Sequence, residues 1–429
     1  MKPTPLKKGV WPTLLLFGFF GQIAWTIENM YFNVFVYNTI TTNPVVVANM
    51  VAASAITATL TTLLMGGLSD RLGKRRAFMV YGYILWGLST MAFAALTVSN
   101  VTAMVGAAAA VQVTATFVIV MDCIMTFFGS SANDAAFNAW INDMTEENQR
   151  GRTESVLAVL PLLSTLFVFG VLDGFTQAGN WSAFFLIVGS IVTIGGVAGF
   201  FFVRDSKALA PKKEPLLKNI VYGLRPKVVK NNKKLYVALC GISILGIGTQ
   251  IYMPYLLIYI QHYQNIQNYV PVMAGVLLGS AAVSVAFGRL IDKVGKLVFA
   301  LPVVAADVVG LALLFFAKGS LPILGAGIVT MGGGMLLSAC VSGLVRDYTP
   351  PEKSGHFQGI RMMFSVLVPM VVGPYIGAAI ISANSVTAGS EQVPGPLMFL
   401  AAAAAHLIVL VPLLWLRHTK KVQPKEENT

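Results

Sequence analysis

The chain has 429 residues, of which 56% are hydrophobic and 11% are charged, and its mean hydropathy is +0.72. Water cannot cover so much apolar surface, so the composition excludes a soluble protein and predicts one that sits in lipid. The net charge of +12 could suggest a nucleic-acid partner, but the basic residues lie in short segments between apolar runs, a pattern typical of cytoplasmic loops. We therefore expect a lipid bilayer, and no nucleic acid, as a partner of this chain.

Twelve apolar runs in the sequence are long enough to cross a hydrocarbon core of about 30 Å as helices. They cover residues 10–38, 44–68, 77–98, 107–142, 154–176, 181–203, 236–261, 269–291, 297–317, 321–345, 359–383 and 394–416. No strong breaker lies between Val101 and Asp143, so we expect one long helix there, bent at Gly129. The pattern predicts an all-α membrane protein with twelve transmembrane helices.

The basic residues indicate how these helices are oriented. If both termini are cytoplasmic, all of the 30 lysines and arginines except Lys318 lie on the cytoplasmic side. Dividing residues 101–143 into two spans would reverse every later loop and destroy this bias. The first apolar run is too long for a cleaved signal peptide and is interpreted as the first span. We expect a multi-pass protein of the plasma (inner) membrane with both termini in the cytoplasm.

A short polar loop after the second run has a counterpart in the second half of the chain. Residues 66–76 are GGLSDRLGKRR and residues 288–296 are GRLIDKVGK, each between two apolar runs. In such a loop a glycine allows a neighbouring backbone to approach, an aspartate caps the turn, and basic residues bind an anionic leaflet. The signature residues are Gly66, Asp70, Arg71, Gly73, Arg75 and Arg76 in the first copy and Gly288, Asp292, Lys293, Gly295 and Lys296 in the second. We predict that these loops form a latch that controls a conformational change.

The repeated loop indicates a doubled chain. Residues 143–151 and 347–355 also align without a gap, each after the fourth run of its half. The sequence predicts the following parts: an N-terminal six-helix bundle over 1–203, a basic cytoplasmic linker over 204–235, a C-terminal six-helix bundle over 236–416 and a cytoplasmic tail over 417–429. Duplication of this kind places a substrate site near the bilayer midplane, where the two bundles meet.

Polar residues inside the apolar runs are the candidates for a binding site. An ionised carboxylate in the bilayer core costs about 2.5 to 3.5 kcal/mol on insertion scales, so such a group usually faces a cavity or a partner and often binds a cation or a proton. The candidates are Gln22, Trp25, Glu28, Asn29 and Asn33 in the first run, Asp122, Asp134 and Asn138 in the fourth, Gln250 and Tyr255 in the seventh, and Asp307 in the ninth. The alternative for each is a structural role, as a neutral group that hydrogen-bonds a neighbouring helix.

The first run has the richest set of these residues. Gln22, Asn29 and Asn33 fall on one stripe of a helix, and Trp25 and Glu28 fall on an adjoining face. Amides and a carboxylate can match the hydroxyl groups of a polyhydroxylated ligand, while an aromatic ring covers its C–H face. The pattern favours a small polar substrate such as a sugar or glycoside.

The two polar loops resemble the loop signature of the major facilitator superfamily of membrane transporters. That resemblance implies a fold of two pseudo-symmetric six-helix bundles. The segment Asp134 to Phe137 with the polar loop that follows it, and residues 346–359, further resemble the glycoside-pentoside-hexuronide cation symporter family. This narrower resemblance implies that Asp134 lies in a cation and sugar region with Asn138 beside it.

The sequence differs from that family at positions that bear on the identity of the coupling ion. Its sodium-coupled members carry two aspartates and a proline in the second helix, whereas residues 57–66 here are TATLTTLLMG and contain neither. The resemblance therefore favours a proton over sodium, with Glu28 or Asp134 as the group that binds it. We expect a monomeric secondary active transporter that works by alternating access, with a small-molecule substrate and without a cofactor or metal.

Two alternatives remain open at this stage. The first is a proton antiporter that exports amphipathic drugs or metabolites, although residues 154–176 contain Pro161 without the glycine-rich cluster that such antiporters tend to carry. The second is a membrane sensor or enzyme. An enzyme needs a positioned nucleophile, an acid and base pair or a metal cluster. The histidines, His262, His356, His406 and His418, are dispersed, and we expect no enzymatic activity.

Overall fold

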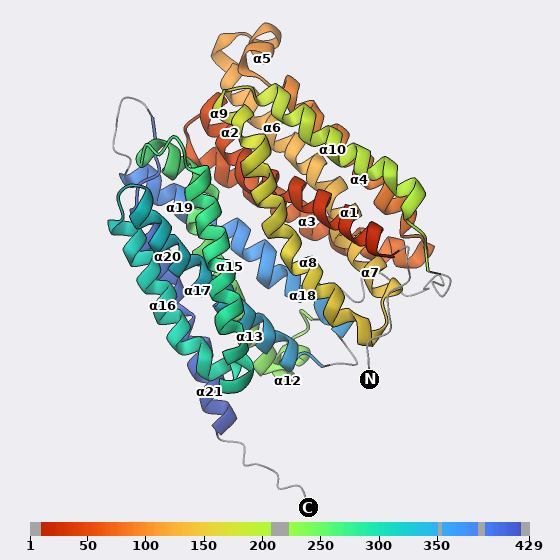
Figure 1. Ribbon diagram of the computed structural model, residues 1–429, viewed down its shortest axis with the longest axis vertical. Helices are drawn as coiled ribbons and strands as arrows, with labels where there is room; N and C mark the ends of the chain where they lie inside the picture. The colour runs from red at the N-terminus through yellow and green to blue at the C-terminus, as the bar shows by residue number, and fades with distance from the viewer. Residues whose placement is uncertain (1–9, 207–222, 351–353, 385–390, 422–429) are drawn as a thin grey trace, which may run out of the picture. The chain divides into compact units, whose positions relative to one another are not determined.

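The computed structural model describes residues 10–206, 223–350, 354–384 and 391–421, and its elements are α-helices with short 3-10 and π-helical segments (Figure 1). Twelve helices in these ranges are long and apolar enough to cross a membrane, which confirms the twelve predicted transmembrane helices. The chain divides into two compact units, Met1–Leu216 and Leu217–Thr429. We describe each unit by itself.

The first unit contains the first six spans. Its helical segments are α1 (Val10–Thr26), η1 (Ile27–Tyr31), α2 (Phe32–Thr39), α3 (Pro44–Leu72), α4 (Arg76–Ala92), η2 (Phe93–Ala95), α5 (Val98–Val105), α6 (Ala107–Gly129), η3 (Ser130–Phe137), α7 (Asn138–Met144), α8 (Glu147–Phe167), η4 (Val168–Leu172), α9 (Asp173–Gln177) and α10 (Trp181–Phe202). Spans 1, 4 and 5 each contain a π-helical segment, and in spans 1 and 4 this segment carries candidate carboxylates. A π-helical turn breaks the regular hydrogen-bond ladder and is often found at functional sites.

The second unit contains the last six spans. Its helical segments are α12 (Pro226–Asn231), α13 (Lys233–Tyr252), η5 (Met253–Tyr255), α14 (Leu256–Ile258), η6 (Tyr259–Tyr263), α15 (Val270–Val294), α16 (Lys296–Phe316), α17 (Ser320–Tyr348), α18 (Ser354–Met362), η8 (Met363–Leu367), α19 (Val368–Asn384), α20 (Leu397–Ile408) and α21 (Leu410–Lys421). Of the predicted linker over 204–235, residues 207–222 lie outside the described residues, as do residues 422–429 of the predicted tail. The last span continues through Thr419 rather than ending at 416.

The fourth span is a single long helix, as the charge pattern predicted. It runs from Ala107 to Met144, and the α-helical geometry changes to a π-helix directly after Gly129. Gly129 packs against Trp86 of α4 so closely that an added Cβ would lie 2.7 Å from the indole ring. The residues before the span form a separate short helix, α5, because Gly106 turns the chain with a positive φ of 81°.

Close helix packing positions the buried acid of the ninth span. In Figure 1, α16 and α17 run side by side in the second unit. Glycines make this approach possible: a Cβ at Gly310 would lie 2.7 Å from the backbone nitrogen of Thr330, and one at Gly333 would lie 3.2 Å from the Cα of Asp307. Asp307 is therefore held at the contact between the two helices, with its side chain 1% exposed.

Candidate functional site

Glu28 lies in the π-helical segment of span 1 and is buried. Its Oε1 accepts hydrogen bonds from Ser54 Oγ of α3 at 2.5 Å and from Thr126 Oγ1 of α6 at 2.8 Å. The two hydroxyls also lie 2.9 Å apart. The other carboxyl oxygen, Oε2, is buried and has no hydrogen-bond partner within the described chain. Side chains from three helices thus meet at one carboxyl group, of which Oε1 has hydrogen-bond donors and Oε2 has none within the described chain.

Asp122 lies one turn before Thr126 on α6, so the two side chains share a helix face. It is 1% exposed, and its Oδ1 has no hydrogen-bond partner among the described residues. Asp122 interacts electrostatically with Glu28, so the structure brings these two candidates together. Two buried carboxylates cannot both stay charged in a low-dielectric interior without a compensating cation, and one shared proton removes most of that cost. This arrangement is suited to binding a proton or a small cation.

Asp134 and Asn138 lie further along span 4 and form mostly local contacts. Asp134 is half-buried and accepts a hydrogen bond from Ser130 Oγ at 3.0 Å. Asn138 is exposed, and its Nδ2 donates to the backbone carbonyl of Asp134 at 3.1 Å. Of these two contacts only that of Ser130 uses the carboxylate, so the Asp134 side chain can accept further hydrogen bonds.

Trp25 takes part in a hydrogen-bonded chain across three spans. Its Nε1 donates to Asn133 Oδ1 at 3.3 Å, Asn133 donates in turn to the hydroxyl of Tyr83, and that hydroxyl donates to the Phe17 carbonyl at 2.6 Å. The ring of Trp25 also packs against Trp86, with centroids 4.9 Å apart. Part of the indole is therefore structural, which the sequence pattern did not show.

The amide stripe of span 1 bonds largely to its own helix. Asn29 is exposed and donates to the Trp25 carbonyl at 2.8 Å, and Asn33 is buried and donates to the Asn29 carbonyl at 3.0 Å. The Oδ1 of Asn33 is buried and has no partner in the described ranges. Gln22 is half-buried. The structure thus leaves parts of Gln22, Trp25 and Asn29 accessible, while it buries Asn33.

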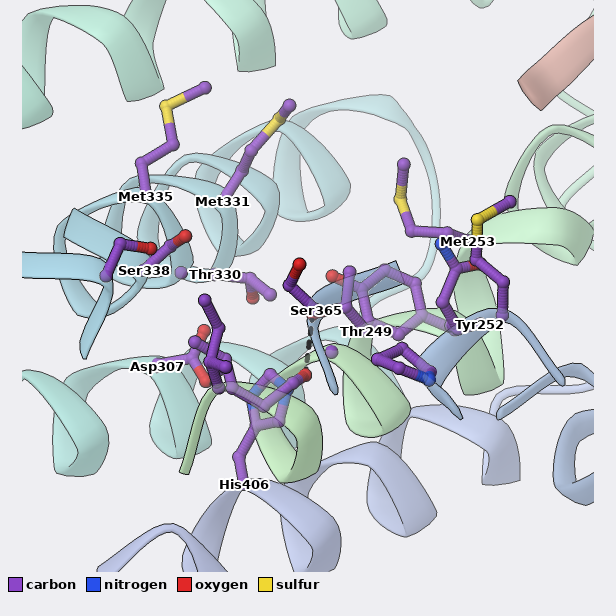
Figure 2. A pocket seen from close by; sticks show the side chains of 18 of the residues that line it. Thr249, Tyr252, Met253, Asp307, Thr330, Met331, Met335, Ser338, Ser365 and His406 are labelled. Atoms are coloured by element: carbon purple, nitrogen blue, oxygen red, sulfur yellow. Dashed lines mark hydrogen bonds and ion pairs between the residues drawn. The ribbon is translucent and has the colours of Figure 1, made fainter. Parts of the chain in front are cut away.

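A cavity of about 720 Å³ opens among the helices of the second unit (Figure 2). Its walls come from α13, α16, α17, α20 and the segment from Ser365 to Met370. Gln250 and Asp307 of the predicted site line it. Tyr255 is absent from its lining: the residue is 1% exposed and its hydroxyl donates to the Pro374 carbonyl at 2.9 Å. In this structure Tyr255 therefore joins two helices, and its predicted binding role stays a prediction.

Sequence reasoning missed the partner of Asp307. His406 of α20 pairs through Nδ1 with Asp307 Oδ2, and its Nε2 faces the Leu245 carbonyl of α13 at 3.1 Å. Figure 2 shows the two side chains together at one side of the cavity, with Met331 and Met335 across from them. A histidine inside an apolar run was the available signal, but the distance in sequence between positions 307 and 406 concealed the pairing.

The first latch loop is organised around Arg75, which is 3% exposed. Its guanidinium contacts Asp70 and Ser69, and its Nε donates to Asp143 Oδ2 at 3.0 Å. Burial would lower the pKa of Arg75, but the hydrogen bonds and charges of Asp70 and Asp143 outweigh burial and raise it above its ordinary value. Arg75 therefore stays cationic and ties the end of α3 to the end of span 4.

Further contacts extend this network. Asp205 Oδ1 accepts hydrogen bonds from the backbone nitrogens of Arg75 at 2.9 Å and Arg76 at 2.8 Å. Gly73 ends α3 in the left-handed conformation with φ 61° and thereby allows the turn into α4. Arg71 is exposed. Gly66 makes no close helix contact, because a Cβ there would lie 3.9 Å from the nearest atom, the Cβ of Ala135.

The second latch loop uses a different cation. Lys296 Nζ pairs with Asp347 at 2.6 Å, while Asp292 and Lys293 are exposed. Gly295 makes the turn with φ 90°. A Cβ at Gly288 would meet nothing within 4 Å among the described residues, so the predicted close approach is not made within the second unit and stays a prediction. The two cations have equivalent partners, since Asp143 and Asp347 occupy matching positions in the ungapped alignment of the two halves.

Twelve spans with buried acids and ion-paired loops define a multi-pass membrane transporter, and comparisons with known proteins agree. The family model described as Major Facilitator Superfamily matches residues 14–371 and 272–429, and the chain belongs to this family. It is thus a secondary transporter and not an enzyme.

Solved structures with the same fold include the nucleoside transporter NupG. A mutant form of NupG superposes with a TM-score of 0.73 at 12% sequence identity, covering 94% of this chain and 99% of that one. A second NupG structure gives a TM-score of 0.71 at 11% identity, covering 95% and 98%. At this identity the likeness concerns the fold. No curated protein sequence matches the chain.

Proposed function

We propose that this chain is a proton-coupled secondary active transporter that moves a small polar solute, a sugar or glycoside, by alternating access. The observation that carries the proposal is the buried pair of acids, Glu28 and Asp122. Both retain a buried oxygen without a partner in the described residues, and two hydroxyl donors hold Glu28 in place. Loading one proton removes the cost of two buried charges, so the occupancy of this pair can bias which conformation is stable.

A sugar or glycoside substrate is supported by the accessible residues of span 1. Gln22 and Asn29 offer amide groups, and Trp25 offers a partly exposed ring, on the same helix as Glu28. The likeness of two loops and one helix end to the glycoside-pentoside-hexuronide family points the same way. NupG is described as a nucleoside transporter, and nucleosides also carry a polyhydroxylated ring, so they belong in any substrate panel.

A second candidate function is export of amphipathic compounds, and one observation favours it. Four methionines, Met253, Met331, Met335 and Met370, line the cavity of the second unit. Methionine side chains adapt to apolar ligands of different shapes, which is typical of promiscuous binding surfaces. Drug-susceptibility profiles of a deletion strain test this candidate: increased susceptibility to several unrelated compounds supports export, and an unchanged profile contradicts it.

The test of the leading proposal is uptake into proteoliposomes that contain the purified protein. Labelled sugars, glycosides and nucleosides are supplied with an inward proton gradient, an inward sodium gradient or no gradient. We expect accumulation with the proton gradient and counterflow without any gradient. Glu28→Gln should abolish accumulation but retain counterflow, whereas Glu154→Gln, at an exposed position of α8, should leave both unchanged. Accumulation driven only by sodium, or no gradient-dependent uptake at all, would overturn the proton-coupled proposal.

We also infer that the protein lies in the plasma membrane as a monomer with cytoplasmic termini, which the basic loops support. Arg71 and Lys293 are both exposed, one in each latch loop. Single cysteines in place of Arg71 and of Lys293 should react with an impermeant thiol reagent only from the cytoplasmic side. Labelling of the two positions from opposite sides would contradict the topology. The mass of the purified protein in detergent tests the monomer.

A further inference from the structure

The Asp307 and His406 pair belongs to neither the latch loops nor the acid pair of the first unit. Both side chains are 1% exposed, and both line the cavity of the second unit. The pair joins α16 to α20, and the contact of His406 with the Leu245 carbonyl joins α20 to α13. Gly248 makes room for the imidazole, because a Cβ there would lie 2.3 Å from His406 Cδ2. A single ring therefore links three spans.

The contacts of the ring determine how many protons the pair holds. A backbone carbonyl can only accept a hydrogen bond, so His406 Nε2 must carry a hydrogen to contact Leu245. The contact between His406 Nδ1 and Asp307 Oδ2 then requires a second hydrogen between those two atoms. That hydrogen makes either an imidazolium with a carboxylate or a neutral imidazole with a carboxylic acid. In both forms the pair has no net charge and holds one proton more than a neutral histidine beside a carboxylate.

Removing this proton breaks one of the two contacts. If the remaining hydrogen sits on Nδ1, the lone pair of Nε2 faces the Leu245 carbonyl. If it sits on Nε2, the lone pair of Nδ1 faces the Asp307 carboxylate. Each case places two acceptors against each other in a buried site and adds a net negative charge, both of which are costly. Deprotonation therefore favours separation of His406 from Leu245 or from Asp307.

The surroundings of the pair leave that charge without a compensating cation. From α13 the titratable residue that lines the cavity is Tyr252, and from α16 it is Asp307 itself. The residues contributed by α17 include Thr330 and Ser338, and those near the start of α19 include Pro369, none of which titrates in the physiological range. No lysine or arginine lines the cavity within the described part of the chain. The Oδ1 of Asp307 is buried without a partner there as well.

From this geometry we propose that Asp307 and His406 form a proton-binding site of the second unit, which loads and unloads through the cavity and whose proton holds spans 7, 9 and 12 together. Only the assignment of this proton to the transport cycle rests on the proposed function. In that cycle the pair is a second coupling site, separate from Glu28. Cavity access allows exchange with water while the ring itself stays buried.

Nuclear magnetic resonance of histidine tests the site without any transport. The chain has four histidines, so His262→Gln, His356→Gln and His418→Gln together leave His406 as the sole labelled histidine. In this variant we expect the Nε2 of His406 to carry a hydrogen at neutral pH and the ring to lose its contact with either Leu245 or Asp307 as pH rises. An Nε2 without a hydrogen at neutral pH, or a ring state that does not change with pH, would overturn the proposal.

Asp307→Asn is the variant that tests the role of the bound proton, because its amide imitates the protonated Asp307 and His406 pair. The amide Nδ2 can donate to Nδ1 of a neutral imidazole while Nε2 still donates to Leu245, so every contact survives without a titratable proton. We expect the melting temperature of the wild type to fall relative to that of Asp307→Asn as pH rises, since the wild type then loses its bound proton. Equal pH dependence of the two proteins would contradict the proposal.

Transport separates this inference from the proposed function. If transport is proton-coupled and the Asp307 and His406 site takes part in it, Asp307→Asn lowers accumulation under a proton gradient by about tenfold or more and leaves counterflow intact. If wild-type uptake ignores the proton gradient but the histidine titrates as expected, the proposed coupling fails and the proton site stands. If uptake follows the proton gradient and Asp307→Asn accumulates substrate like the wild type, the site has no part in coupling and that assignment fails.

Discussion

The two units use six spans each but place different chemistry inside them. In the first unit the buried acid Glu28 is held by hydroxyl groups from α3 and α6, and Asp122 is a second buried acid on α6. In the second unit the buried acid, Asp307, is held by an imidazole from α20. A carboxyl with hydroxyl donors and a carboxyl with a histidine are both suited to hold a proton, and the histidine also contacts the backbone of a further helix. The two units thus have the same number of spans but different interior residues.

The latch loops show the same divergence at the membrane surface. Arg75 is buried and binds two aspartates, whereas the side chain of Lys296 is 31% exposed and binds one aspartate whose own side chain is 51% exposed. A guanidinium can serve two carboxylates at once because its donors are fixed in a planar fork, and an ammonium is a point charge. We infer that the ion pairs of the first loop stabilise its unit strongly and that the ion pair of the second loop does so weakly.

The largest expected difference comes from removing each cation. Arg75→Ala should lower the free energy of unfolding of the first unit by about 3 kcal/mol, because it leaves Asp70 and Asp143 facing each other at a partly buried site. Lys296→Ala should cost about 0.2 to 1 kcal/mol, as is typical of an exposed pair. Unfolding of both variants in detergent measures this difference. Equal losses would mean that the two loops are equivalent after all.

A smaller difference is expected from the aspartates of the two signatures. Asp70 binds the buried Arg75, whereas Asp292 is exposed. Asp70→Asn should slow conformational cycling by about tenfold while changing substrate affinity little, because it weakens a contact within the loop and none with a candidate binding residue. Asp292→Asn is the matched control and should have no effect. Rates of exchange and binding constants, compared in the same preparation, test this. A loss of affinity as large as the loss of rate would contradict the latch.

The smallest effects are expected at the glycines. Gly73 has a positive φ that favours glycine, so Gly73→Ala should destabilise the first loop by about 1 kcal/mol. Gly288 lies inside α15 with open space around it, so Gly288→Ala should stabilise that helix by about 0.5 to 1 kcal/mol. Thermal unfolding of the two variants checks these opposite signs. If Gly288→Ala were destabilising, this would indicate that Gly288 does make the close helix contact that the sequence suggested.

The sequence by itself determined the transmembrane architecture. The twelve apolar runs and the long fourth span agree with the structure to within a few residues at most helix ends. The reason is local: a segment in lipid must satisfy its own backbone hydrogen bonds, so its length and composition are enough to predict a helix. The bend expected at Gly129 stays a prediction, although the helix changes to π-helical geometry directly after this residue.

Only the tertiary structure decided which polar residues act together. Ser54 and Thr126 could not be assigned to Glu28, nor His406 to Asp307, because these partners lie on different helices and far apart in sequence. The rotation of each helix about its axis decides such pairings, and it depends on packing contacts such as those of Gly248 and Gly333. A run of apolar residues predicts that a helix spans the membrane, but it does not predict which neighbour each of its side chains will face.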